Sequence, residues 1–202
     1  MKKVTLVLFL FICGTTYSLD RVVDPNLSGS NGTTLFTTIT SAVNASVNGD
    51  RILIKMGTYN EPTLTISKSL TLISQTAGTK INFNGNIVIA GFPGMKLEIL
   101  GFNLGIYSVS SNTIPSGNVS SRAKISFIEC KMQDLSVNQD FYELNCALCS
   151  ISGITTFRFG NFVASKTNNL DIIDEPNSNN THSYMLIAND TITGRLSIRN
   201  DD

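Results

Sequence analysis

The sequence has no tryptophan, a single histidine at His182, and few charged side chains, 15% of its 202 residues. Lysine plus arginine and aspartate plus glutamate number 15 each, so the formal net charge is zero. A nucleic-acid or anionic-membrane partner requires an excess of basic residues that this chain does not have. The sequence therefore predicts neither partner, and no motif in it predicts a cofactor or a complete set of metal ligands.

Long hydrophobic runs are also missing. The run from Val4 to Ile12 is too short to span a bilayer; it follows Lys2-Lys3 and precedes the small-x-small sequence Thr16-Tyr17-Ser18. This pattern predicts a secretory signal peptide over residues 1–18. A lipoprotein signal at Cys13 is less favoured because Ile12 suits it poorly. We expect a secreted protein, extracellular or at the cell surface, whose mature chain has a formal charge of −2 once Lys2 and Lys3 are removed, and no membrane span.

Three cysteines remain in the mature chain, an odd number that cannot be fully paired within it: Cys130, Cys146 and Cys149. The pair Cys146-Ala-Leu-Cys149 has the spacing of half a zinc site, but there is no second pair and His182 stands alone. We therefore expect small apolar residues packed inside the fold or at its corners, with room for one disulfide.

The order of short β-rich runs suggests a solenoid. Three such runs lie almost end to end between Gly49 and Ile73, and the breaks between them are too short for crossover helices. Two-residue hairpin signals are mostly absent from these breaks. In a solenoid, each short strand pairs with its counterparts one coil above and below.

Further short strands are expected along the chain, with glycines at the corners and about 20 to 25 residues per coil, on the order of seven coils. These strands are Lys80 to Phe83, Ile87 to Ile89, Met95 to Leu100, Lys124 to Ile128, Asp140 to Leu144, Phe157 to Phe159, Ser183 to Ala188 and Arg195 to Arg199. Two stretches, Ser108 to Arg122 and Ser165 to Asn180, are expected to be projecting loops.

The two ends of the solenoid are expected to differ. Ile39, Ala42 and Val43 share one face of a helix predicted over Thr37 to Val47, with Thr37 or Thr38 as N-cap, and this helix can cover the first coil. No helix follows the last strand, which predicts an exposed edge. From this we expect a truncated chain, a continuation of the solenoid, or a partner contact at the C-terminal coil.

The segment from Phe36 to Ile73 resembles the opening of right-handed parallel β-helix proteins of the pectin lyase-like superfamily, nearest to the pectinesterase branch. The matching features are a T-I-x-x-A-V helix, then G-T-Y-x-E, then K-x-L-T-L-I. The resemblance implies an all-β fold: a single-stranded right-handed parallel β-helix over residues 19–202 with an N-terminal capping α-helix.

A second resemblance to pectinesterases covers Cys130 to Asn161. It matches the family's Gln-Asp pair with Gln133 and Asp134, which implies that Asp134 is the general acid or base and Gln133 an oxyanion donor. The family's second aspartate, the nucleophile, is replaced by Thr156. Acidic and basic candidates for lyase chemistry, such as Asp140, Glu129 and Arg158, have no supporting spacing.

These observations favour a non-catalytic function. We expect a surface solenoid that binds extracellular polysaccharide through outward polar and aromatic residues, Tyr107, Phe141 and Tyr142 among them. The alternatives are a divergent pectinesterase-like or polysaccharide lyase-like enzyme that uses Asp134, and a structural surface module.

Overall fold

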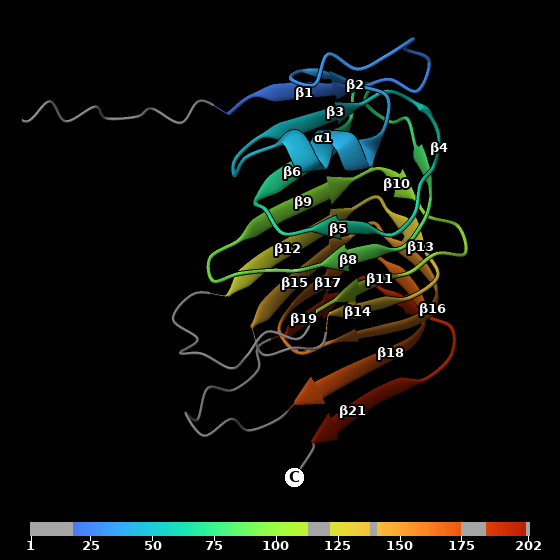
Figure 1. The fold of residues 1–202 in the computed structure, drawn as a ribbon. Helices are drawn as coiled ribbons and strands as arrows, with labels where there is room; N and C mark the ends of the chain where they lie inside the picture. Colours follow the sequence, from blue (N-terminus) through green and yellow to red (C-terminus); the bar gives the residue numbers. More distant parts are fainter. Residues whose placement is uncertain (1–17, 113–121, 138–140, 175–184, 201–202) are drawn as a thin grey trace, which may run out of the picture.

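The protein is built almost entirely of parallel β-strands in long stacked sheets (Figure 1). The computed structural model describes residues 18–112, 122–137, 141–174 and 185–200. The predicted signal peptide up to residue 17, Asp140 and His182 lie outside these ranges. Within the described residues there is one α-helix, and no helix there is long and apolar enough to cross a membrane. This architecture is consistent with a β-helix-like fold.

One side of the molecule is a nine-stranded sheet, called sheet A here, with the order β19-β17-β15-β12-β9-β6-β3-β1-β2. All its strand pairs are parallel. Its strands are β1 (Asp20–Val23), β2 (Leu35–Phe36), β3 (Arg51–Ile54), β6 (Leu70–Ser74), β9 (Lys96–Leu100), β12 (Ala123–Ile128), β15 (Tyr142–Ala147), β17 (Gly160–Val163) and β19 (Met185–Ala188).

The remaining strands form a twelve-stranded sheet, called sheet B, in which two ladders meet at β16. One ladder runs β4-β7-β10-β13-β16 and the other β5-β8-β11-β14-β16, and β18 pairs with β16, β20 and β21. The strands are β4 (Gly57–Asn60), β5 (Leu64–Ile66), β7 (Ile81–Asn84), β8 (Ile87–Ile89), β10 (Phe102–Asn103), β11 (Val109–Ser111), β13 (Lys131–Met132), β14 (Leu135–Val137), β16 (Ser150–Phe157), β18 (Lys166–Asp174), β20 (Thr191–Ile192) and β21 (Leu196–Asn200).

The chain visits the sheets in a repeating order, so each strand pairs with its counterpart one repeat later. In sheet A the successive partners of Leu53 are Ile73, Leu100, Ile128, Ala147, Val163 and Ala188. The step from Ala147 to Val163 is the shortest of these repeats, and the step from Leu100 to Ile128 is the longest. Both steps fall outside the expected range of coil lengths, so the repeats are less uniform than the sequence suggested.

Alternate side chains of each strand point inward and fill the interior. The strand β12 shows the pattern well, because Ala123, Ile125 and Phe127 are buried while Lys124, Ser126 and Ile128 face outward. The buried residues of both sheets join in one hydrophobic core. Parallel pairing along the stack and side-chain contact across the interior thus come from the same period-two pattern.

The helix α1 (Ile39–Ala45) confirms the predicted N-terminal helix, although it is shorter than expected. Its N-cap is Thr38, whose side-chain oxygen accepts a hydrogen bond from the Ser41 N–H. The buried residues of α1 are Ile39, Ala42 and Val43, the three predicted to share a face. They belong to the same core as the strands, at the N-terminal end of the stack.

Three predicted segments differ from the structure. Ser165 to Asn180 was expected to be a loop, but Lys166–Asp174 forms β18, the longest of the described strands. Ser108 to Arg122 was also expected to be a loop, but Val109–Ser111 within it forms β11. The strand expected at Phe157 to Phe159 is instead the end of a longer strand, β16, which runs from Ser150 to Phe157. All three strands contain many polar residues, which hid them from sequence reasoning.

Candidate functional site

The outer face of sheet A carries a continuous row of aliphatic side chains. Register places Val22, Leu53, Ile73, Leu100, Ile128, Ala147, Val163 and Ala188 side by side on successive strands; we call this row the aliphatic column. All eight are partly exposed rather than buried in the core. Adjacent members are separated by one strand spacing, about 4.8 Å, so the column is a regular apolar strip along the stack.

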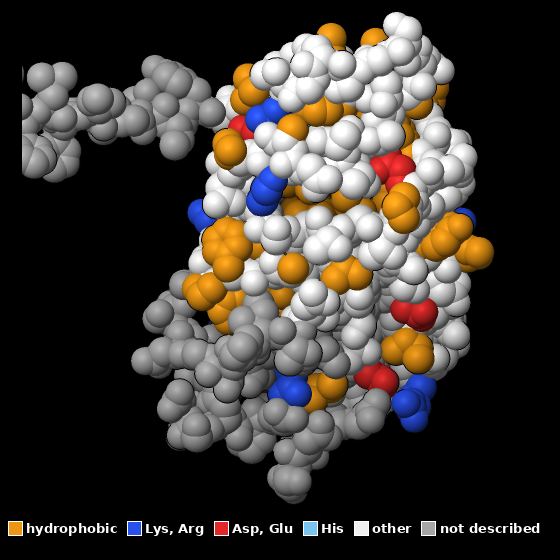
Figure 2. All heavy atoms as spheres, viewed as in Figure 1, with side chains coloured by type: hydrophobic (Ala, Val, Ile, Leu, Met, Phe, Trp, Pro, Cys, Tyr) orange, Lys and Arg blue, Asp and Glu red, His pale blue; other side chains and the backbone are white. Residues whose placement is uncertain are grey.

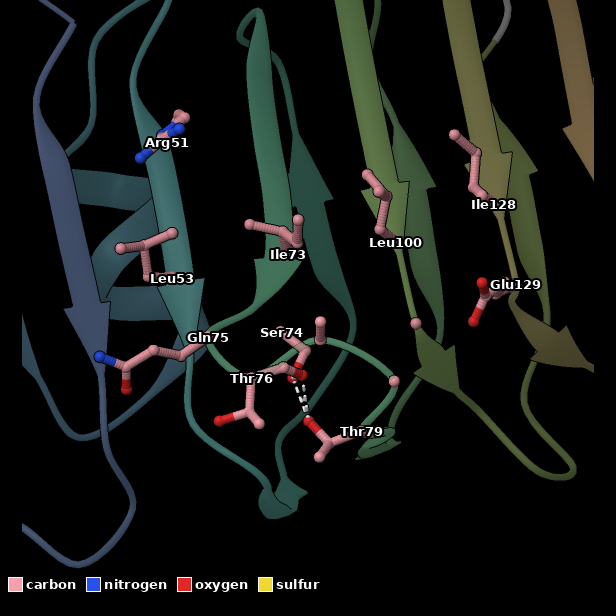
Figure 3. A pocket seen from close by; sticks show the side chains of 13 residues that line it. Arg51, Leu53, Ile73, Ser74, Gln75, Thr76, Thr79, Leu100, Ile128 and Glu129 are labelled. Atoms are coloured by element: carbon pink, nitrogen blue, oxygen red, sulfur yellow. Dashed lines mark hydrogen bonds between the residues drawn. The ribbon is translucent and has the colours of Figure 1, made fainter.

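A pocket of about 400 Å³ lies over the middle of the aliphatic column. Leu53, Ile73, Leu100 and Ile128 project from four neighbouring strands and form its floor (Figure 3). The segment from Gln75 to Thr79, which follows β6, forms a wall beside them. The pocket is therefore an apolar floor with a polar rim.

The wall is held by its own hydrogen bonds. The Ser74 and Thr79 hydroxyls bond to each other, and the Thr79 hydroxyl also donates to the Thr76 carbonyl at 2.7 Å. The backbone turns at Gly78, whose φ of 74° lies in the left-handed region that glycine adopts without strain. The wall is thus a turn that is stabilised by hydrogen bonds within its own segment.

Exposed ion pairs lie at the two ends of the pocket. At one end Arg51 forms a two-point contact with Asp20, with nitrogen–oxygen distances of 2.9 and 2.8 Å. At the other end Glu129 pairs with Lys80 at 3.0 Å. The hydrogen bond from the Arg51 guanidinium holds the pKa of Asp20 below its usual value. The pocket can therefore offer both a donor and an acceptor at its rim.

A second, polar depression of about 340 Å³ lies beside the aliphatic column on the same face of sheet A. Lys96, Glu98, Lys124 and Asn145 are among its lining residues. Lys124 also pairs with Glu143 at 3.4 Å. The outer face of sheet A thus combines a hydrogen-bonding region with an apolar strip, a combination suited to ligands that have polar groups and apolar faces.

Asp134, the predicted acid or base, lies at a corner of sheet B between β13 and β14. Its Oδ1 accepts the Ile154 N–H at 2.8 Å, and its Oδ2 accepts the Ser108 hydroxyl at 3.2 Å. At Gly153 an added Cβ would come within 2.1 Å of Asp134 Oδ1, so the glycine permits this close approach.

The contact made by Asp134 recurs at the same corner of other repeats. Asn86 Oδ1 accepts the Ser108 N–H at 3.0 Å, and Asn169 Oδ1 accepts the Arg195 N–H at 2.8 Å. At a turn, a backbone N–H of the next repeat lacks the carbonyl partner that it would have in the sheet. A short side chain that accepts this N–H replaces the missing hydrogen bond. This repetition favours a structural role for Asp134.

Gln133 lies next to Asp134 at the same corner and also makes contacts with the following repeat. Its Oε1 accepts the Ser152 hydroxyl at 3.0 Å, and its carbonyl accepts the Gly153 N–H at 2.7 Å. Thr156, which stands in place of a nucleophilic aspartate, pairs in register with Ser136 on β14 and Asp171 on β18.

The aromatic residues expected to bind a ligand are placed differently from the prediction. Tyr142 was expected to face outward, but it is 0% exposed, and its hydroxyl accepts the Gly91 N–H at 3.0 Å. Tyr107 and Phe141 are partly buried and pack against the core. Phe141 also meets the Tyr142 ring edge-on, with ring centroids 5.6 Å apart. The strand β15 begins at Tyr142, and its alternating pattern starts with a buried residue, so the Tyr142 side chain points inward.

The three cysteines are free and buried, as the sequence predicted for small packed residues. Cys130 and Cys149 precede the paired residues Lys131 and Ser150, so they occupy equivalent positions in adjacent repeats. Burial and contact with the Cys149 thiol raise the pKa of Cys130. Within the described ranges, no group of three or more histidine, cysteine or acidic side chains is arranged to hold a metal ion.

Sequence reasoning missed the outer face of sheet A. A weak signal was present, because Leu72-Ile73 in β6 and Ile99-Leu100 in β9 are neighbouring aliphatic residues that face opposite sides of the sheet. Comparison of the chain with protein-family models, curated proteins and solved structures gives no significant match.

Proposed function

We propose that this protein is a secreted right-handed parallel β-helix of the pectin lyase-like type, with a non-catalytic function, that binds extracellular polysaccharide on the outer face of sheet A. The observation that carries the binding proposal is the pocket over the aliphatic column, with its apolar floor and charged rim. Support for a solenoid comes from the parallel pairing of each strand with the next repeat. The predicted signal peptide supports secretion.

The chemistry of the face suits sugar polymers. A sugar ring presents C–H groups on its faces and hydroxyls around its edge. Leu53, Ile73, Leu100 and Ile128 offer a surface for the C–H groups, and Lys96, Glu98 and Asn145 offer hydrogen bonds to hydroxyls. Repetition of both features at each strand allows an extended polymer to make several equivalent contacts, which add up in affinity.

The surface charge also agrees with a neutral or weakly charged ligand. The charged side chains that line the two depressions on sheet A are of both signs, Arg51, Lys96 and Lys124 with Glu98 and Glu129. On the other face of the molecule, shown in Figure 2, acidic and basic side chains are likewise scattered among neutral polar groups. Electrostatic attraction to a strongly anionic polymer needs a patch of one sign. We therefore expect binding to depend weakly on ionic strength.

Binding to a panel of plant and algal polysaccharides tests the proposal, with retention on the polymer and release of product both measured. The double variant Leu100→Thr/Ile128→Thr removes apolar floor while keeping strand-compatible residues. We expect its affinity to fall about tenfold or more, which corresponds to about 1.4 kcal/mol.

Val88→Thr is the matched control, because Val88 is partly exposed and lies in sheet B. Its affinity should equal that of the unmodified protein. Equal affinity of the double variant and the control, or no retention of the unmodified protein on any polymer, contradicts the proposal.

The alternative is a divergent pectinesterase-like or polysaccharide lyase-like enzyme that uses Asp134. Asp134→Asn tests it, since the amide oxygen can still accept the Ile154 N–H as asparagine does at two other corners. Product release that disappears in this variant would establish the enzyme. The absence of product from both proteins contradicts the enzyme alternative.

A structural surface module is a third candidate, favoured by one observation. Leu196 and Ile198 on β21 are 51% and 65% exposed, although their neighbours on β18 belong to the core. Self-association in sedimentation experiments that is abolished by Ile198→Lys would support a module that assembles through this end.

A further inference from the structure

A fully buried carboxylate lies beside the first described residues of the chain. Asp50, in the turn before β3, is 0% exposed and accepts three hydrogen bonds: from the Val47 N–H at 2.9 Å, the Leu19 N–H at 3.0 Å and the Arg21 guanidinium at 2.9 Å. A charge is tolerated at such a site only when donors surround it. The backbone nitrogen of Leu19 is one of these donors.

The peptide bond before Leu19 is accessible. Ser18 and Leu19 are both exposed, and β1 begins only at Asp20. On its C-terminal side, the Leu19 carbonyl accepts the Arg51 N–H at 3.1 Å. On its N-terminal side, the hydroxyl of Ser18 donates to the Gly49 carbonyl at 2.7 Å. Cleavage of the Ser18–Leu19 bond thus removes one surface hydrogen bond and leaves the pairing of β1 intact.

We propose that the Ser18–Leu19 bond is a processing site and that Asp50 is the built-in acceptor for the α-ammonium group that processing creates. The inference rests on the proposed secretion, because it needs a peptidase of the secretory pathway. Hydrolysis adds one water: the leader leaves with a carboxylate on Ser18, and the Leu19 nitrogen takes up a proton at neutral pH. The hydrogen bond from a neutral N–H to the Asp50 carboxylate then becomes an ion pair.

Ion pairing strengthens the contact because a positively charged donor adds Coulomb attraction to the hydrogen bond that the Asp50 carboxylate already accepts. The charged groups around the new terminus are Asp50 in its turn, Asp20 and Arg21 on β1, and Arg51 on β3. Arg51 is paired with Asp20 and Arg21 with Asp50. Leu19 is 38% exposed, so the second positive charge near Asp50 is partly hydrated.

The sign of the pH dependence follows from this pairing. The carboxylate of Asp50 raises the pKa of the α-amino group in the folded protein above its unfolded value of about 7.7 to 8.0. The added stability is fully present below the unfolded pKa and is lost as pH rises through the folded pKa. Processing thus makes the folded state more stable at neutral pH than at alkaline pH.

The experiment begins with the full precursor expressed in a secreting host, followed by mass spectrometry and N-terminal sequencing of the exported protein. We expect the sequence to begin at Leu19. Selective capping of its α-amino group should then lower the melting temperature at pH 7 by about 2 to 4 °C. This is the shift that a loss of about 1 kcal/mol produces in a chain of this length. Capping should have little effect at pH 10.

Two variants serve as controls. In Asp50→Asn, capping should leave the melting temperature unchanged at both pH values. A precursor with one glycine inserted between Ser18 and Leu19, exported with that glycine at its terminus, moves the ammonium group away from Asp50. This second variant keeps the carboxylate intact and should melt like the capped protein, even if Asp50→Asn does not fold.

The outcomes separate this inference from the proposed function. Export with a terminus other than Leu19, or equal capping effects with and without the inserted glycine, overturns the inference and leaves secretion and polysaccharide binding standing. Retention of the precursor inside the cell with its leader attached overturns both secretion and the inference.

Discussion

At the N-terminal end of the stacked sheets, α1 covers the core with Ile39, Ala42 and Val43, whereas at the C-terminal end β21 leaves Leu196 and Ile198 about half or more exposed (Figure 1). The two exposed residues pair in register with Leu170 and Ile172 on β18, both 0% exposed. Residues of the same type in the same row of the sheet thus differ in burial. The difference arises because described strands lie on both sides of β18 but on only one side of β21.

The ion pairs of the two ends differ in the same way. Arg21 and Asp50 form a pair at 2.9 Å with 7% and 0% exposed side chains. Arg195 and Asp171 form a longer pair at 3.5 Å, in which the arginine is 69% exposed and the aspartate 8%. An exposed charge can exchange its partner for water, whereas a buried charge cannot. We therefore expect the two ion pairs to contribute unequally to the free energy of unfolding.

The largest contrast is expected from removal of each arginine. Arg21→Met removes the guanidinium partner of the buried Asp50 carboxylate and should lower the free energy of unfolding by about 3 to 5 kcal/mol. The matched variant Arg195→Met should cost less, about 1 kcal/mol, because the Arg195 side chain is largely in water and its contact with Asp171 is long. Urea unfolding followed by circular dichroism measures both. Similar losses in the two variants would show that the ends do not differ in this respect.

Truncation of neighbouring isoleucines should give the next contrast. Ile172→Ala creates a cavity in the packed core and should lower the free energy of unfolding by about 2 to 5 kcal/mol. Ile198→Ala, one strand further, should cost less than about 1 kcal/mol because its side chain is already largely in water. The same urea titration compares them. A loss at Ile198 as large as that at Ile172 would mean that another surface covers this end in solution.

A smaller effect is expected at the helix that covers the first coil. Thr38→Ala removes the hydrogen bond to the Ser41 N–H and should cost about 1 kcal/mol. The neighbouring variant Thr37→Ala, outside the cap, should change the free energy of unfolding by less than about 0.5 kcal/mol. Thermal melting resolves this difference. Equal effects would show that the cap does not contribute to the protection of this end.

The smallest effect is a change in acid stability. Burial alone raises the pKa of Asp50, but the N–H groups of Val47 and Leu19 and the Arg21 guanidinium together hold it below its usual value. A depressed pKa contributes stability that is present above the unfolded pKa of about 3.9 and is lost as pH falls through the folded pKa. Unfolding free energies measured from pH 6 down to pH 2 should therefore fall less steeply in Asp50→Asn than in the unmodified protein. Parallel curves would contradict this assignment.

Local sequence patterns predicted a good part of the fold. Alternation in runs such as Lys124 to Ile128 indicated strands, and the spacing of Ile39, Ala42 and Val43 indicated the helix, because both signals depend on the short periods of the local backbone. The lack of turn signals between short strands pointed correctly to parallel pairing rather than hairpins. The shortest strands, such as β10 and β13, were missed because so short a segment carries no period.

The candidate site depended on information that the sequence did not contain. Leu53, Ile73, Leu100 and Ile128 each lie a full repeat from the next along the chain, and only register brings them together as the floor of one pocket. The motif around Asp134 pointed toward catalysis, whereas the structure gives both its oxygens hydrogen bonds at a corner that asparagines occupy in other repeats. Tyr142 faces the interior because the start of β15 sets its phase, and a shift by a single position reverses which face a side chain occupies.

The sequence by itself thus determined many of the strand-forming segments and the helix-forming segment of the described residues. Only the tertiary structure decided which residues share a face, which carboxylate is buried, and which apolar row remains outside. The physical reason is that strand and helix preferences act between near neighbours in the chain, whereas burial, register and charge pairing depend on residues one or more repeats away.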